Sequence, residues 1–316
     1  MAVTQLLGIS ITVADLATAA FYRDRLGLEI GPEHTVSDPA WNTLLGLTPR
    51  TTARAIDVAI GPMTVELVAF DPPGLAYPAE RASTDLWFEH CALVCRDIAA
   101  ARERLAGGSF GAITDGGPVL LPPNTGRVSA FKFRDPEGHP LELITFPEGV
   151  GAAVWHQSPG PGILGYDHTA ISVLDVDRSI AFYSGLLGFS IGGRSLNQGP
   201  EQDRLDGLTG CAVDVVALEP ASVATPHVEL LHYRTPLGRV AAAEVRSNDV
   251  AAVRQVHAVD DLDAIVRRLE RAGVRFVSPG VVTSQSGRRA AVVRDPDEHA
   301  IMLVAQGEAE AERAKP

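Results

Sequence analysis

The stretch Phe133–Phe146, which reads FRDPEGHPLELITF, indicates the closing hairpin of a β-sheet. Its DPEG segment, residues 135–138, is typical of a turn, because proline presets φ and glycine tolerates a positive φ. The residues after the turn alternate as a strand does, which places Glu142 on the face opposite to Leu141 and Leu143. A carboxylate within an apolar strand is costly unless water, a hydrogen-bond donor or a metal ion compensates for its lost hydration.

The composition is that of a globular protein. Of the 316 residues, 46% are hydrophobic and 21% charged, and the net charge is -12. The negative charge argues against nucleic-acid and anionic-membrane partners. No apolar run is long enough for a membrane span, no export signal is apparent, and the three cysteines form no Cys-x-x-Cys pair. We therefore expect a cytoplasmic protein.

The chain repeats itself. A strand, a helix and about three further strands recur four times, and the last hairpin of the second repeat returns in the fourth as VRDPDEHAIMLV, residues 293–304. The helices of the first and third repeats match as FYRDRLGL (21–28) and AFYSGLLGF (181–189). The predicted organisation is a domain over 1–146 (modules 5–70 and 86–146), a linker over 147–162, a domain over 163–307 (modules 163–233 and 250–305) and a polar tail over 308–316.

These motifs resemble the vicinal oxygen chelate superfamily, which includes glyoxalase I, bleomycin-resistance proteins, methylmalonyl-CoA epimerase and extradiol dioxygenases. The resemblance covers nearly the whole chain. It implies an α+β fold in which four βαβββ modules pair into two cup-shaped mixed β-sheets. It specifies the reaction poorly, because the superfamily spans several chemistries.

The resemblance also implies where metal ligands would lie. In the family they come from the first and last strands of each module, the first lying seven residues before the Asp that leads into the helix. Carried over to this sequence, the positions in modules two and three are His90, Glu142, His168 and Glu229. Those in modules one and four are Gly8, Glu66, Arg254 and Met302, which do not form a metal site. The residues therefore favour pairing module two with module three; pairing one with two and three with four, as in the dioxygenases, stays open.

Two imidazoles and two carboxylates suit a divalent ion such as Zn, Ni, Co, Mn or Fe. Such an ion acts as a Lewis acid towards a substrate with neighbouring oxygens. Glu142 or Glu229 is then the expected catalytic proton shuttle. The predicted function is a glyoxalase- or epimerase-like isomerase or lyase.

Two alternatives remain at this stage. One is an Fe(II)-dependent extradiol-type dioxygenase, which uses two His and one carboxylate. The other is a non-enzymatic binding protein of the resistance type, which the 6% aromatic content weakens. The expected partner is a small molecule, in a monomer or homodimer. Arg127, Lys132 and Arg134 are candidates for binding an anionic substrate, but we favour their interpretation as solvated strand-edge charges.

Overall fold

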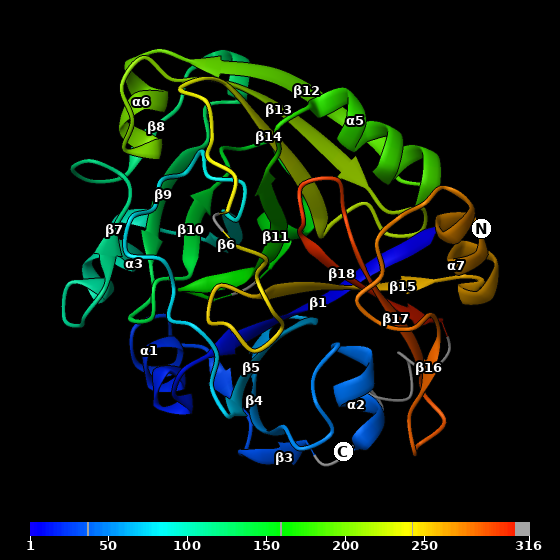
Figure 1. Cartoon of the computed structure of the whole chain (residues 1–316). Helices are drawn as coiled ribbons and strands as arrows, with labels where there is room; N and C mark the ends of the chain where they lie inside the picture. The colour runs from blue at the N-terminus through cyan, green and yellow to red at the C-terminus, as the bar shows by residue number, and fades with distance from the viewer. Residues whose placement is uncertain (37, 159, 242, 307–316) are drawn as a thin grey trace.

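Two mixed β-sheets form the framework of the protein (Figure 1). The computed structural model describes residues 1–306 apart from 37, 159 and 242, so the predicted tail at 308–316 lies outside it. Across the described residues each sheet has nine strands, and the helices are short and lie at their margins. None of the described helices is long and apolar enough to cross a membrane.

The first half of the chain supplies two of the predicted modules. Module 1 comprises β1 (Val3–Val13), η1 (Leu16–Thr18), α1 (Ala19–Asp24), β2 (Glu29–Ile30), β3 (His34–Val36), α2 (Pro39–Leu44), β4 (Thr52–Ile60) and β5 (Met63–Asp71). Module 2 comprises β6 (Glu89–Cys95), α3 (Ile98–Leu105), β7 (Gly111–Ala112), β8 (Val119–Leu120), η2 (Pro123–Thr125), β9 (Ser129–Arg134) and β10 (Pro140–Thr145).

The second half repeats the order after the short helix α4 (Ala153–Gln157). Module 3 comprises β11 (Ile163–Ser172), α5 (Val176–Ile180), η3 (Ala181–Leu186), β12 (Ser190–Gln198), α6 (Pro200–Asp206), β13 (Ala212–Glu219) and β14 (His227–Thr235). Module 4 comprises β15 (Val253–Val259), α7 (Leu262–Arg271), β16 (Val282–Thr283), β17 (Arg289–Arg294) and β18 (Ala300–Ala305).

A capping aspartate follows the first strand of every module. The side chains of Asp15, Asp97, Asp175 and Asp261 each accept a hydrogen bond from a backbone N–H in the first turn of the following helix. This satisfies donors that a helix start leaves unpaired. The repeated Asp that sets the predicted ligand register therefore has a structural reason to recur.

Each sheet joins one module from the first half of the chain to one from the second. In one sheet, β6 of module 2 pairs antiparallel with β11 of module 3. In the other, β1 of module 1 pairs antiparallel with β15 of module 4. The predicted pairing of module two with module three is therefore confirmed.

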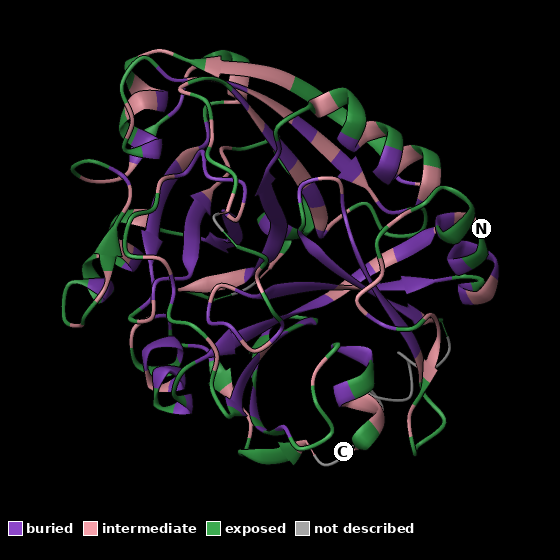
Figure 2. Cartoon of the chain, viewed as in Figure 1, coloured by how far each residue is buried: buried purple, intermediate pink, exposed green. Residues whose placement is uncertain are grey.

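Two hydrophobic cores connect the modules within each half of the chain. One cluster draws on modules 1 and 2, with Tyr166 and Val253 added, and a second draws on modules 3 and 4, with Val3 added. The strands are accordingly buried along most of their length, while the outer helix faces are exposed (Figure 2). Three further clusters join module 1 to module 4 or module 2 to module 3, as the sheets do, so neither half can separate without exposing a core or a sheet edge. The domain division at 147–162 stays a prediction.

The hairpin turn at 135–139 is a point where modules 1, 2 and 4 meet. Asp135 accepts backbone hydrogen bonds from Glu137, Gly138 and His139 and bonds to the His139 Nδ1 at 2.9 Å. The His139 Nε2 lies 3.0 Å from the Thr12 carbonyl and 2.8 Å from the Val250 carbonyl. Both ring nitrogens thus face acceptors, which requires an imidazolium. Burial alone would lower the pKa of His139, but Asp135 outweighs it and raises that pKa.

We expect His139→Ala to lower the free energy of unfolding by about 3–5 kcal/mol, because it leaves the buried Asp135 carboxylate without its cation. This loss of unfolding free energy should be greatest below about pH 6.5, the ordinary pKa of His, and should shrink as pH rises through the raised pKa of His139. Urea unfolding of wild type and variant at several pH values measures the difference. The exposed His34→Ala serves as control and should change stability by less than about 0.5 kcal/mol. Equal effects of the two substitutions would contradict this role of His139.

Candidate metal centre

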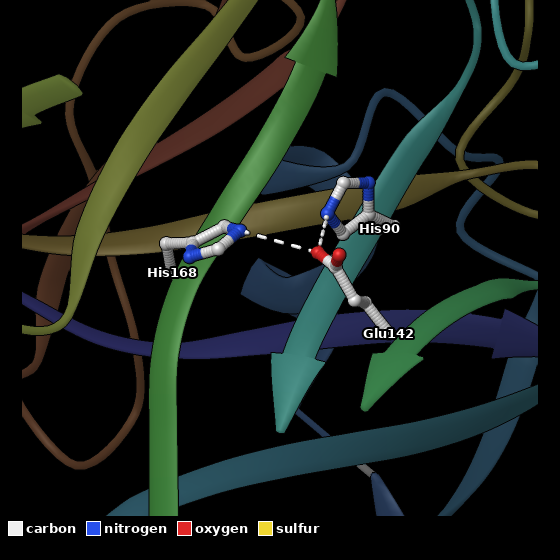
Figure 3. A group of neighbouring side chains, drawn as sticks. All are labelled: His90, Glu142 and His168. Atoms are coloured by element: carbon white, nitrogen blue, oxygen red, sulfur yellow. Dashed lines mark ion pairs between the residues drawn. The ribbon is translucent and has the colours of Figure 1, made fainter. Parts of the chain in front are cut away.

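The four residues predicted as ligands come together on adjacent strands of the second sheet. His90 lies on β6, Glu142 on β10, His168 on β11 and Glu229 on β14, and the strand order there is β14-β11-β6-β10. The Glu142 Oε2 is 2.8 Å from the His90 Nε2 and 3.5 Å from the His168 Nε2 (Figure 3). The His168 Nε2 is also 3.5 Å from the Glu229 Oε2. Two imidazoles and two carboxylates therefore point at a common centre.

His168 is held in one tautomer by a pair of residues that sequence reasoning missed. The Asp167 Oδ2 lies 3.0 Å from the His168 Nδ1, and the Asp167 Oδ1 accepts a 2.7 Å hydrogen bond from the Trp155 Nε1. With its Nδ1 directed at Asp167, His168 turns its Nε2 toward Glu142 and Glu229. A carboxylate behind a ligating His is the usual orienting partner in metal sites.

A third imidazole, His227, also lies at this centre. Its Nε2 is 3.5 Å from the Glu229 Oε1, and its ring centroid is 5.4 Å from that of His168. The signal was present in the sequence, since His227 precedes Glu229 by two positions on one strand and so shares its face. In the described part of the chain the candidate metal groups are His90–Glu142–His168 and Asp167–His168–His227.

The charges at this centre favour a bound cation, which would take the place of the proton on His168, whose pKa Glu229 raises against the effect of burial. Burial would raise the pKa of both carboxyls, but the imidazoles outweigh it: His90 and His168 hold the pKa of Glu142 well below its usual range, and His168 and His227 lower that of Glu229 to about 2. Burial lowers the pKa of His90. Both nitrogens of the buried His90 lack a hydrogen-bond partner, because the close approach of Glu142 does not have hydrogen-bond geometry. A divalent ion fits this donor set and would give the His90 ring a partner.

The hollow over these residues has a volume of about 210 Å³. One wall is apolar and includes Leu121, Val128, Ile144, Leu205, Val213, Val215 and Leu231. On the other, the buried Lys132 Nζ bonds to the Asp206 Oδ1 at 2.6 Å. Asp206 also accepts hydrogen bonds from Gln202 and Tyr233. The Gln202 Oε1 is buried and has no partner, so it is an acceptor available in the hollow.

The interpretation of the strand-edge cations was wrong for two of the three. Lys132 and Arg134 are both buried, whereas Arg127 is exposed. Lys132 pairs with β10 opposite Glu142, so its side chain shares the face of the metal centre and finds Asp206 there. Arg134 donates to the Gly138 carbonyl and lies over the Tyr77 and Phe88 rings. Alternation along β9 does not reveal that other modules cover both of its faces.

The corresponding cup of modules 1 and 4 is chemically different. The buried Arg254 donates to the Ser10 and Thr12 hydroxyls at 2.9 and 3.0 Å and to the Ser247 carbonyl at 2.9 Å. Glu66 is half-buried, and burial raises its pKa even though Ser10 and Arg254 oppose this. Neither candidate metal group in the described residues includes Glu66. A fixed guanidinium near this cup disfavours a cation, in agreement with the sequence analysis.

Comparison with known proteins supports the family. Residues 165–303 match the model of the Glyoxalase/Bleomycin resistance protein/Dioxygenase superfamily, so the chain contains a domain of this superfamily. This confirms, for that part of the chain, the family predicted from its motifs. No curated protein sequence matches significantly.

The overall fold is similar to solved structures over nearly the whole chain. Glyoxalase I from Zea mays has a TM-score of 0.64 at 17% identity, covering 98% of this chain and 97% of that one. A putative dioxygenase from Bacillus subtilis has a TM-score of 0.60 at 14% identity, covering 97% and 86%. At these identities the likeness establishes the glyoxalase-like fold.

We expect His90→Ala to remove a bound divalent ion, because it deletes an imidazole donor from the centre. The fall in metal affinity should exceed the about 10–100-fold that is typical when a residue hydrogen-bonded to a metal ligand is removed. Titration of metal-depleted protein with Zn²⁺ and elemental analysis after dialysis measure the affinity and the bound metal. Glu66→Ala, at the equivalent position of the other cup, should bind the ion as the wild type does. Equal loss in both variants would show that the ion does not lie in the cup of modules 2 and 3 alone.

Proposed function

We propose that the protein is a divalent-metal-dependent isomerase or lyase of the glyoxalase or epimerase type, acting on a small substrate with two neighbouring oxygens. The observation that carries the proposal is the convergence of His90, Glu142, His168 and Glu229 on one buried centre. These four residues would hold the ion. When bound, it would supply Lewis acidity that polarises the substrate oxygens and favours proton loss from the adjacent carbon.

Glu229 is the better candidate for the base that takes this proton. Glu142 lies within ion-pair distance of both His90 and His168, and only 6% of its side chain is exposed, against 22% for Glu229. A general base must move between the reacting atom and its resting position, which favours the carboxylate that is less enclosed. The His227 Nε2 lies 3.5 Å from the Glu229 Oε1, so it is placed to share the proton that Glu229 takes from the substrate.

The hollow also limits the substrate. Its volume of about 210 Å³ is below the roughly 300–1,000 Å³ of pockets that enclose drug-sized ligands. The apolar wall favours a compact, mainly hydrocarbon body. The unpartnered Gln202 Oε1 favours a hydrogen-bond donor on the substrate at the end that faces Lys132 and Asp206.

One observation favours a second candidate, an Fe(II)-dependent extradiol-type dioxygenase. The ligand atoms of His90, Glu142 and His168 all lie within 4.8 Å of one another, whereas Glu229 is outside this group and pairs with His227. Two His and one carboxylate form the donor set of non-haem Fe(II) oxygenases. Whether Glu229 binds the ion therefore separates the two chemistries.

The discriminating measurement is an anaerobic assay in deuterated water, with Zn, Ni, Co, Mn and Fe tested separately on α-hydroxyketones, thiohemiacetals, acyl-CoA epimers and catechols. The proposal predicts turnover without oxygen and incorporation of deuterium at the substrate carbon. We expect Glu229→Gln to reduce this exchange by about 10²–10⁴-fold, the usual contribution of a positioned general base. The amide oxygen remains a weaker donor, so the variant should still retain the ion at saturating metal.

The two carboxylates should respond differently to the same substitution. Glu142→Gln should lower metal affinity more than Glu229→Gln does, because Glu142 faces both His90 and His168. Strict dependence on Fe(II) and oxygen with no deuterium incorporation would replace the proposal by the dioxygenase. Exchange unaffected in Glu229→Gln but lost in metal-saturated Glu142→Gln would assign the base to Glu142.

A further inference from the structure

A second cavity, of about 520 Å³, lies away from the metal centre. It is bounded by the linker between β14 and β15, the start of β6, the start of β15 and the β17–β18 turn. Its lining combines apolar residues, most of them alanine or valine, with charged side chains, of which Glu89, Arg294, Asp297 and His299 are buried. Comparison of the linker before β15 with the equivalent linker before β6 shows which side chains are missing from this cavity.

The two linkers that precede β6 and β15 are equivalent. Pro72 and Pro236 start them, and Gly74 and Asp85 of the first match Gly238 and Asp249 of the second. Their backbone contacts also match: Phe88 N–H donates to Asp85 and Ala252 N–H donates to Asp249, at 2.8 and 2.9 Å. The linkers even bond reciprocally, Leu86 to Arg239 and Val250 to Leu75. In this register Tyr77 corresponds to Ala241 and Phe88 to Ala252.

In the first linker two aromatic rings fill the space beside the hairpin turn. The Tyr77 ring meets the His139 ring edge-on, with centroids 5.6 Å apart. The Arg134 guanidinium lies 5.8 Å from the Tyr77 centroid and 5.9 Å from the Phe88 centroid. A phenol ring is thus held between a guanidinium and an imidazole.

In the second linker the same guanidinium and imidazole remain, but alanines replace both rings. Arg294 and His299 occupy the places of Arg134 and His139 in the repeated hairpin. Arg294 donates to the Glu298 and Val245 carbonyls, and the Glu89 Oε2 lies 3.7 Å from the His299 Nδ1. The Arg294 Nε and the Glu89 Oε1, however, are buried without a hydrogen-bond partner. Leaving these two atoms unpaired is costly, which favours a polar guest in the site.

The residue at the turn supports the same interpretation. A Cβ at Gly138 would lie 2.5 Å from the Arg81 Nη1 and 3.2 Å from the Tyr77 Cγ, so the Arg81 and Tyr77 side chains both crowd this position in the filled half. The other half has Glu298 at this position, with a φ of 79°, and Ala241 in the place of Tyr77.

We propose that this cavity binds a small phenol-like aromatic molecule in the place that Tyr77 and Phe88 fill in the other half. The ring lies among Ala241, Ala252 and His299. An aromatic hydroxyl both donates and accepts, so it suits either the Glu89 Oε1 or the Arg294 Nε as its partner. Glu89 directly precedes the metal-centre residue His90 on β6 and projects from the opposite face of the strand, so this site is separate from the metal cup.

The test is binding of 4-fluorophenol, followed by ¹⁹F NMR line broadening and isothermal titration on metal-depleted protein. We expect saturable binding to the wild type and loss of that binding in Ala241→Tyr, which returns the missing ring to the cavity. Ala221→Tyr adds the same ring on an exposed loop and should bind as the wild type does. His168→Ala should also bind normally, which excludes the metal cup as the site.

Two further measurements keep the proposal open to refutation if Ala241→Tyr does not fold. Ala252→Phe fills the cavity from the other linker position and should also abolish binding. Fluorobenzene, which has no hydroxyl, should bind the wild type at least about 10-fold more weakly, the effect of about 1.4 kcal/mol. Absence of saturable 4-fluorophenol binding, unchanged binding in both cavity-filling variants, or equal affinity for fluorobenzene would each overturn the proposal.

Discussion

The antiparallel pairing of β6 with β11 is the contact on which the metal centre depends. It places Ala170 opposite His90 and Ala92 opposite His168, so the two imidazoles come from neighbouring strands of different modules. The parallel partners of these strands, β10 and β14, bring Glu142 and Glu229 to either side. No single module holds more than two of the four residues. The site therefore forms only when the two halves of the chain have assembled.

Buried histidines in this protein fall into two kinds, and the difference explains which of them belong to the site. His139 has an acceptor at both ring nitrogens, so both of its N–H groups and its positive charge are paired within the fold. His90 has a hydrogen-bond partner at neither nitrogen, and its Nε2 is approached only by the Glu142 carboxylate, although it is as deeply buried. A satisfied imidazolium stabilises a turn, whereas an unsatisfied neutral imidazole in a carboxylate-lined hollow is costly without a bound cation.

Much of this arrangement could be predicted from the sequence because a local signal fixed the register. The capping Asp after each first strand has a physical role of its own, and the family resemblance, which places a ligand seven residues before it, pointed to His90 and His168. The glycine stops and the repeated DPEG-type hairpin located the remaining strands. Sheet pairing was predicted only through the distribution of ligands, since no local feature of β6 selects β11 over β1 as its partner.

The residues that sequence reasoning missed are those whose role depends on another module. Asp167 matters because Trp155 and His168 meet it. Lys132 was interpreted as solvated because its strand, taken alone, has an exposed face; α6 of module 3 covers that face and supplies Asp206. His227 was the exception, since its spacing from Glu229 was readable and was not used.

The two halves of the chain show how one framework supports different contents. Each cup has the same strands, yet His90 in one corresponds to Arg254 in the other, where three oxygen acceptors hold the guanidinium. The linkers also differ. In the linker before β6, the rings of Tyr77 and Phe88 fill the space beside the hairpin, whereas in the linker before β15, Ala241 and Ala252 leave a cavity there. In both comparisons the backbone hydrogen bonds are preserved while the enclosed side chains change. Because capping, turn and ladder contacts carry the fold, the interior of each cup and linker was free to change in polarity and volume. A buried polar group that remains unpaired after such a change, as at His90, Glu89 and Arg294, then marks a place where the fold alone does not account for the sequence.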